Sequence, residues 1–153
     1  MKVSLLYGTE TGNAEMLCED IEENLDGIDD VETANLEDTA PGDLQADRFY
    51  LMVCSTYGEG ELPQSAIPFV DALKEEATDL SGIRFAVFGL GDTNYDQTYN
   101  NGSVVLTQAL TAAGAKAIGE RGLHDASGLD DAIDIALPWA VAQIAEAKKH
   151  YEE

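Results

Sequence analysis

The chain alternates between two spacings of apolar residues. Short continuous apolar runs are typical of strands buried on both faces of a sheet, and they occur at residues 2–7, 48–54, 83–90 and 115–123, with a weaker run at 31–36. Between these runs, apolar residues recur at helical spacing. This second pattern predicts helices over residues 13–25, 65–77, 104–113 and 129–150, and we expect Pro138 to interrupt or kink the last one.

Predicted strands and helices follow each other nearly throughout the chain. This order predicts an α/β fold, in which a doubly wound parallel sheet carries helices on both faces. The sequence shows no internal repeat and no low-complexity linker, and residues 39–46 are expected to form a loop. Because 153 residues are sufficient for one hydrophobic core, we expect residues 1–153 to form a single domain.

Ligands of doubly wound sheets bind outside the carboxyl ends of the strands. The loops that follow predicted strands are therefore the candidate site. Three of these loops are rich in functional groups, and they span residues 8–14, 55–63 and 91–102.

The first loop has the composition of a phosphate site. It precedes a predicted helix, whose first turn offers free N–H groups and the positive end of the helix dipole. Gly12 lets the backbone approach a ligand closely, and Thr9 and Thr11 add hydroxyl donors. The loop holds no Lys or Arg, and it matches neither the lysine-bearing phosphate loop nor the G-x-G-x-x-G motif. Neutral donors at a helix start favour a phosphate, although an ordinary threonine-capped helix would show the same residues.

The second and third loops offer aromatic side chains. Tyr57 is followed by Gly58, whose peptide can adopt either sign of φ, and the third loop carries Tyr95 and Tyr99. Tyrosines on strand-end loops can stack on a flat ring, and long loops in a compact domain are usually functional. Ordinary polar loops would also have this composition. Taken with the first loop, they predict a phosphorylated ligand with a flat ring.

The charge of the chain restricts its partners. Thirty acidic residues against eight basic ones give a formal net charge of −22, which repels nucleic acid and anionic membranes. This charge attracts a basic protein partner, although a solvated acidic coat, as in proteins adapted to high salt, explains it equally well. No apolar run is long enough to span a bilayer, and the first residues enter a strand pattern directly, so we expect a cytoplasmic protein. Cys18 and Cys54 are expected to be buried free thiols, and no metal-site spacing occurs.

Four segments, in this order, resemble the flavodoxin family. They read GTETGNAE, STYGEGELP, FAVFGLGDTNYD and GAKAIGERGLHD. The resemblance covers nearly the whole chain and is to short-chain flavodoxins of the MioC type and to the FMN domains of diflavin reductases. It implies a five-stranded parallel sheet in the order 2-1-3-4-5 and FMN bound without a covalent link.

The resemblance also implies which residues contact the cofactor. The implied phosphate loop comprises Thr9, Glu10, Thr11, Gly12, Asn13 and Ala14. The residues implied along the ribityl chain and the flavin ring are Ser55, Thr56, Tyr57, Gly58 and Glu59. Those implied at the pyrimidine edge and the other ring face are Leu90, Gly91, Asp92, Asn94 and Tyr95. Tyr57 and Tyr95 would be the stacking pair, and Asp125 stands where relatives have an acid near the ring.

The third loop departs from the family pattern. Relatives usually carry an aromatic residue three positions after the tyrosine, whereas this chain has Thr98 there and Tyr99 one position later. Ser103 also stands where relatives often have lysine. We therefore include Tyr99 among the candidate cofactor residues and expect a changed packing of this loop.

By this resemblance, the chain would be an electron carrier without catalytic or metal-binding residues. It would transfer electrons one at a time, through a flavin semiquinone, from a separate reductase to an acceptor protein, both with basic faces, and it would act as a monomer. The acids Glu59, Asp92 and Asp96 would lower the second reduction potential, and the Gly58 carbonyl would accept a hydrogen bond from the reduced ring.

Three other functions are compatible with this fold. One is an FMN-dependent NAD(P)H quinone or nitro reductase, which would need a second substrate pocket. Another is a phospho-acceptor signalling domain, which needs an aspartate where the chain has Cys54 and Ser55. The third is a flavin-free interaction protein.

Overall fold

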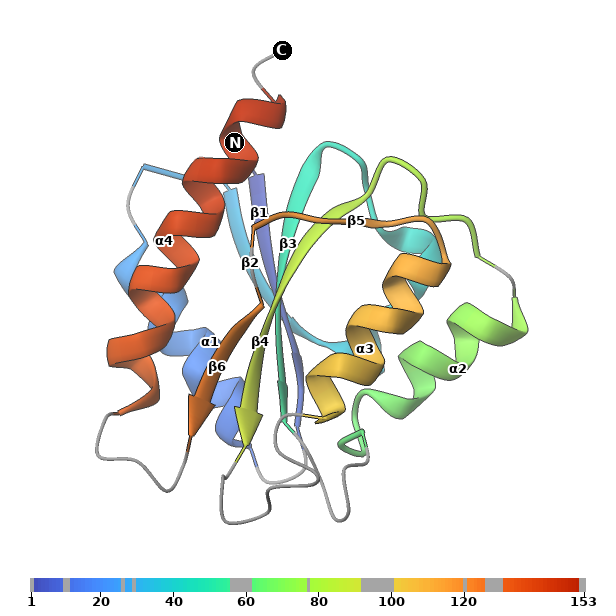
Figure 1. The fold of residues 1–153 in the computed structure, drawn as a ribbon, viewed down its shortest axis with the longest axis horizontal. Coiled ribbons are helices and arrows are strands. Elements are labelled where there is room, and N and C mark those ends of the chain that lie inside the picture. The colour runs from blue at the N-terminus through green and yellow to red at the C-terminus, as the bar shows by residue number, and fades with distance from the viewer. Residues whose placement is uncertain are drawn as a thin grey trace.

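The structure is a computed structural model. It describes residues 2–9, 12–25, 27–28, 30–55, 62–76, 78–91, 101–119, 121–125 and 131–151. In these ranges it shows one parallel sheet covered by helices on both faces (Figure 1). None of the helices in the described ranges is long and apolar enough to cross a membrane.

The sheet confirms the predicted α/β fold and the strand order 2-1-3-4-5. Neighbouring strands run in the order β2-β1-β3-β4-β5, all paired in parallel, and β6 pairs with β4. The strands are β1 (Lys2–Gly8), β2 (Asp30–Asn35), β3 (Arg48–Ser55), β4 (Arg84–Gly91), β5 (Lys116–Ala117) and β6 (Gly122–Asp125).

The last predicted strand, 115–123, is in fact two short strands on the same edge of β4. β5 pairs with Arg84 and Phe85, and β6 pairs with residues 88–91. Between the two lies Gly119 with a φ of 68°, a left-handed conformation that ends regular pairing. The side chain of Gln143 fills the space that a Cβ at Gly119 would occupy.

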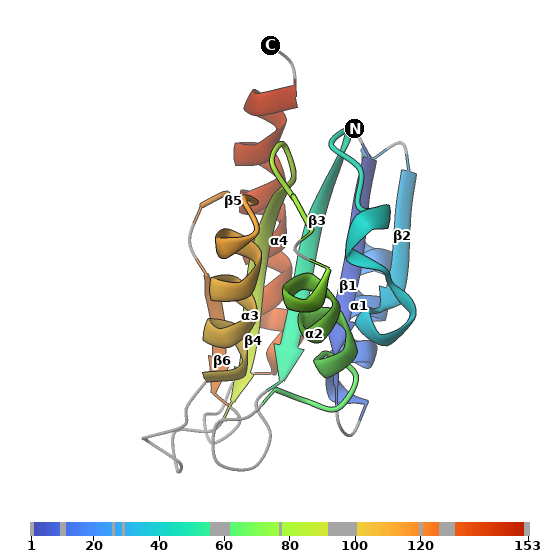
Figure 2. The ribbon, with the colours of Figure 1, turned by 90° about the vertical axis from the view of Figure 1, so that its right-hand side faces the viewer.

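Two helices cover each face of the sheet (Figures 1 and 2). One pair is α1 (Asn13–Asn24) and α4 (Ala132–Tyr151), and the other is α2 (Ile67–Glu75) and α3 (Asn101–Ala112). Two short 3-10 turns, Leu36–Asp38 and Pro41–Asp43, connect β2 to β3. α4 continues through Pro138 without the interruption that we predicted. Pro138 lies on the exposed side of the helix, where water can satisfy the carbonyl group that loses its partner.

The core consists of two clusters, one on each side of the sheet. On β3, Phe49 and Leu51 pack in the cluster with α1 and α4, whereas Tyr50 and Met52 pack in the cluster with α2 and α3. All four side chains are buried, as the continuous apolar run predicts for a strand covered on both faces.

A buried guanidinium connects the amino-terminal ends of three strands. Arg48 of β3 donates hydrogen bonds to Asp30 Oδ2 at 2.8 Å, to Ser4 Oγ at 2.8 Å and to the Val3 carbonyl at 3.1 Å. Its side chain is only 8% exposed. This network stabilises the sheet at the edge opposite to the candidate site and leaves the carboxyl ends of the strands available for a ligand.

Candidate functional site

The candidate site lies where β1, β3, β4 and β6 end together. The strand register pairs Gly8 with Cys54, Ser55 with Leu90, and Gly91 with Asp125. Since hydrogen-bonded strands are about 4.8 Å apart, the chain leaves these four strands along one continuous edge. The structure therefore brings the starts of all three predicted loops together.

An acidic residue of α1 influences the end of β1. Tyr7 of β1 is nearly buried, and burial raises the pKa of its hydroxyl. The carboxylate of Glu15, in the first turn of α1, raises that pKa further because its negative charge disfavours the ionised tyrosine. The Tyr7 hydroxyl therefore stays protonated beside the first turn of α1.

The described part of the first loop has an internal hydrogen bond. The Gly12 N–H donates to Thr9 Oγ1 at 2.8 Å. Because this bond uses the hydroxyl oxygen as an acceptor, the hydroxyl proton of Thr9 remains available to donate to a ligand.

The backbone conformation of Gly12 allows a ligand to approach the first loop closely. Its φ of 94° lies in the left-handed region, and a Cβ built there meets no heavy atom within 4 Å among the described residues. A side chain would thus occupy open space in front of the helix, which is the space a ligand needs. Gly12 is also the N-cap of α1 and has no side chain to cap the first-turn amides. The residues present therefore fit a phosphate group held by amides and hydroxyls.

The other residues that we predicted for this loop differ in what they can offer. Asn13 is exposed, whereas Ala14 is fully buried in the core, so only the backbone N–H of Ala14 can face a ligand. Glu10 and Thr11 lie outside the described residues.

A turn that the sequence did not indicate packs against the first loop. Residues 62–66 lead into α2, and Ser65 within them is 5% exposed. The Thr9 N–H donates to Ser65 Oγ at 2.7 Å, and the Ser65 N–H donates to the Thr9 carbonyl at 3.4 Å. We expected Ser65 to begin a helix, but α2 begins at Ile67, and the polar groups of Ser65 bind Thr9 instead. No local sequence signal identifies this partner, which is 56 positions away.

Where the sequence predicts the flavin ring, the structure describes only the ends of the strands. Ser55 and Leu90 are half-buried at the ends of β3 and β4, and Gly91 is the last residue of β4. Asp125 ends β6 in register with Gly91. The remaining predicted ring residues lie outside the described ranges, and they are Thr56, Tyr57, Gly58, Glu59, Asp92, Asn94, Tyr95, Asp96 and Tyr99.

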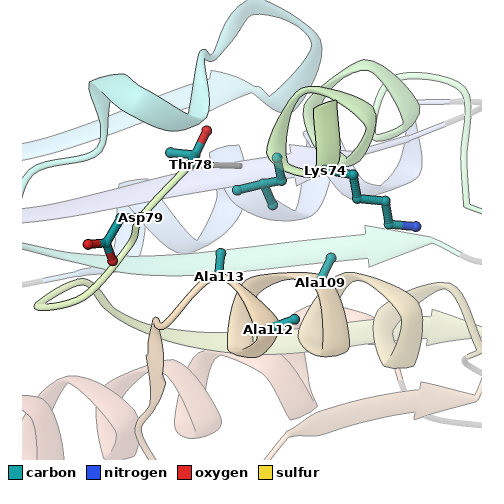
Figure 3. Close-up of a pocket in the computed structure, with 7 residues that line it drawn as sticks. Lys74, Thr78, Asp79, Ala109, Ala112 and Ala113 are labelled. Carbon is teal, nitrogen blue, oxygen red and sulfur yellow. The ribbon is translucent and has the colours of Figure 1, made fainter. Parts of the chain in front are cut away.

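A separate hollow lies between α2 and α3, far from this edge (Figure 3). Its volume is about 410 Å³. Ala109 of α3 lies opposite Lys74 of α2, and Ala113, which follows α3, lies opposite Thr78 and Asp79. It is near the C-terminal ends of both helices, and none of the predicted site residues lines it. Among the described residues, no group of three His, Cys, Asp or Glu is arranged to hold a metal ion.

Comparison with known proteins gives a consistent result. The flavodoxin family profile matches residues 5–139. Protein MioC of Escherichia coli K12 is 35% identical over 118 residues, which are 77% of this chain and 79% of MioC. The sulfite reductase [NADPH] flavoprotein alpha-component of Bacillus subtilis is 35% identical over 122 residues, which are 78% of this chain but 20% of that protein.

Solved structures agree with the sequence matches. A mutant of flavodoxin from Pseudomonas aeruginosa superimposes with a TM-score of 0.79 and 28% sequence identity, over 96% of this chain and 99% of that one. The chain belongs to the flavodoxin family of electron-transport flavoproteins, as a short-chain member.

Proposed function

We propose that this chain binds FMN without a covalent link and carries electrons one at a time from a separate reductase to an acceptor protein. The observation that carries this proposal is the start of α1, where, among the residues that the structure describes, left-handed Gly12 leaves open space and no side chain caps the helix. Membership of the flavodoxin family and the match to reductase flavoproteins support the cofactor and the electron-transfer role.

The chain's own residues supply binding and orientation. The Thr9 hydroxyl and the first-turn amides of α1 would donate hydrogen bonds to the phosphate. The ends of β3 and β4, at Ser55 and Gly91, would position the ribityl chain and the ring. FMN supplies the redox chemistry when bound, and the protein tunes it through the groups near the ring.

The acidic surface supports partners with basic faces. A net charge of −22 would accelerate the encounter with such a reductase or acceptor, and the same charge opposes self-association, so we propose a monomer. The two cysteines are unpaired and lie in different core clusters, which is compatible with the cytoplasmic location that we propose.

The experiment is an absorption spectrum of the purified protein with FMN, followed by stepwise reduction without oxygen. A yellow complex that takes up its two electrons in two resolved steps supports the carrier. A complex reduced in one two-electron step, together with turnover of NADPH by the pure protein, would favour a quinone or nitro reductase. A protein that is colourless once unbound FMN has been removed would reject both functions. Sedimentation of the same sample tests the monomer.

A further inference from the structure

We infer that Ser65 is a positioning residue for the phosphate loop, which makes the site select a phosphorylated flavin over the unphosphorylated one. This inference rests on the proposed function. Ser65 does not belong to the loop itself. It lies in the turn 62–66, which leads from the described end of the second loop into α2.

The contact between the turn and the loop is reciprocal. The Thr9 N–H donates to Ser65 Oγ at 2.7 Å, and the Ser65 N–H donates to the Thr9 carbonyl at 3.4 Å. Both polar groups of the Thr9 backbone are therefore bound by one residue. This fixes the peptide planes on either side of Thr9 and, with them, the direction of its side chain.

The same contact extends to Gly12. The Thr9 hydroxyl accepts the Gly12 N–H at 2.8 Å, and Gly12 adopts the left-handed conformation from which α1 begins. A chain of hydrogen bonds thus runs from Ser65 through Thr9 to the start of α1. If Ser65 Oγ is removed, the Thr9 amide loses its acceptor and the loop is free to sample other conformations.

Gly8 allows this contact to form. A Cβ at Gly8 would lie 2.8 Å from the Cβ of Ala66 and 3.4 Å from Cγ of Pro63. The Cβ at position 8 and the Cβ of Ala66 are each attached directly to the backbone, so neither can rotate away from the other. The turn packs against the end of β1 because position 8 has no side chain.

Ser65 itself is suited to hold a loop rather than a helix. Its side chain is 5% exposed, and α2 has Ala66 as its N-cap, without a side-chain hydrogen bond to the helix. A serine that begins a helix normally caps it. Here the hydroxyl serves Thr9, and the helix begins without a cap.

The test compares two flavins in the full-length protein, because riboflavin has the ring and ribityl chain of FMN but no phosphate. Flavin fluorescence titration measures both dissociation constants for wild type and Ser65→Ala. Loss of one hydrogen bond that holds the binding conformation should raise the FMN dissociation constant about tenfold. The riboflavin constant should stay unchanged, since riboflavin does not use the loop.

A matched control removes a serine hydroxyl elsewhere. Ser81 donates to Asp79 Oδ1 at 2.6 Å in an exposed turn before β4, at the other edge of the sheet. Ser81→Ala should leave both flavin constants unchanged. If Ser65→Ala weakened the binding of FMN and of riboflavin equally, or did not weaken the binding of FMN, the inference would be overturned.

A second measurement does not require flavin. In the protein without FMN, hydrogen exchange at the Thr9 and Gly12 amides should accelerate in Ser65→Ala, while exchange within β3 stays as in wild type. Gly8→Ala, which forces the turn away from β1, should give the same pattern. Unchanged exchange at both amides would overturn the inference. Failure of the wild-type protein to bind FMN would instead reject the proposed function, so the two failures are distinguishable.

Discussion

Gly122→Ala tests whether close packing between β6 and α4 contributes to the stability of the fold. Gly122 is buried at the start of β6. A Cβ there would lie 2.8 Å from both Cδ1 and Nε1 of Trp139 and closer still to Cδ2 of Phe88. The added methyl group therefore collides with two rings at once, and at least one ring must move.

The expected loss in the free energy of unfolding depends on which of the two rings can move. Phe88 is fully buried on β4, whereas Trp139 is half-buried on α4 and can tilt toward solvent. The two rings now lie 5.3 Å apart at 60°, a favourable arrangement worth about 1 kcal/mol. With overpacking strain of typically 1–3 kcal/mol added, we expect a loss of about 2–3 kcal/mol in the free energy of unfolding. In a chain of this length, that loss lowers the melting temperature by roughly 5–10 °C.

The assay is thermal unfolding followed by circular dichroism, together with the fluorescence of the single tryptophan. The emission of Trp139 should shift to longer wavelength as the ring becomes more exposed. Gly42→Ala is the matched control, since a Cβ at Gly42 meets nothing within 4 Å among the described residues and the backbone there is ordinary. A Gly122→Ala protein with the melting temperature and emission of wild type would refute the reasoning.

Other contacts lead to three further predictions. The hydrogen bond from Arg48 lowers the pKa of Asp30. The Arg48–Asp30 pair therefore stabilises the fold fully at pH values above the ordinary carboxyl pKa of about 4. This stabilisation is lost as the pH falls through the lowered pKa of Asp30, because the carboxyl group becomes protonated. Asp30→Asn should therefore reduce stability to urea at pH 7, and a deficit of the same size at about pH 2 would contradict this. Burial raises the pKa of the Cys54 thiol to about 12 and also raises the pKa of the Cys18 thiol. A thiol reagent at pH 8 should therefore label neither cysteine before the protein unfolds. Rapid labelling of the folded protein would contradict this. Gln143 Oε1 is buried without a hydrogen-bond partner among the described residues, so Gln143→Met should stabilise the protein to urea by about 1 kcal/mol, and a loss of stability would contradict this.

The central part of the fold could be predicted from the sequence because its signals are local. The apolar run at 48–54 matches β3 to within one residue, and the run at 2–7 matches β1 equally well. Strands covered on both faces need apolar residues at every position, and this requirement appears directly in the sequence. The strand order came from the family resemblance, since pairing between distant strands leaves no local pattern.

The strands β5 and β6, which pair beside β4, could not be predicted in the same detail. The apolar residues of 115–123 continue across the break, but left-handed Gly119 ends β5 pairing and β6 begins again at Gly122. The space beside Gly119 is occupied by Gln143 of α4. A break that depends on a side chain from another element cannot be read from the strand's own sequence.

The candidate site shows the same division between local and distant causes. Thr9 and Gly12 were predicted because a glycine-bearing loop before a helix has a recognisable composition, and the structure places them at the carboxyl edge of the sheet. Ser65 was predicted only as the first residue of a helix. Serine suits a helix start and a loop contact equally, since its hydroxyl accepts an N–H in either place. What decides between them is Gly8, which lets the turn approach β1 so closely that Ser65 Oγ accepts the Thr9 N–H. The role of Ser65 is thus set by a missing side chain 57 positions earlier, so that Gly8 and Ser65 are expected to act on phosphate binding together.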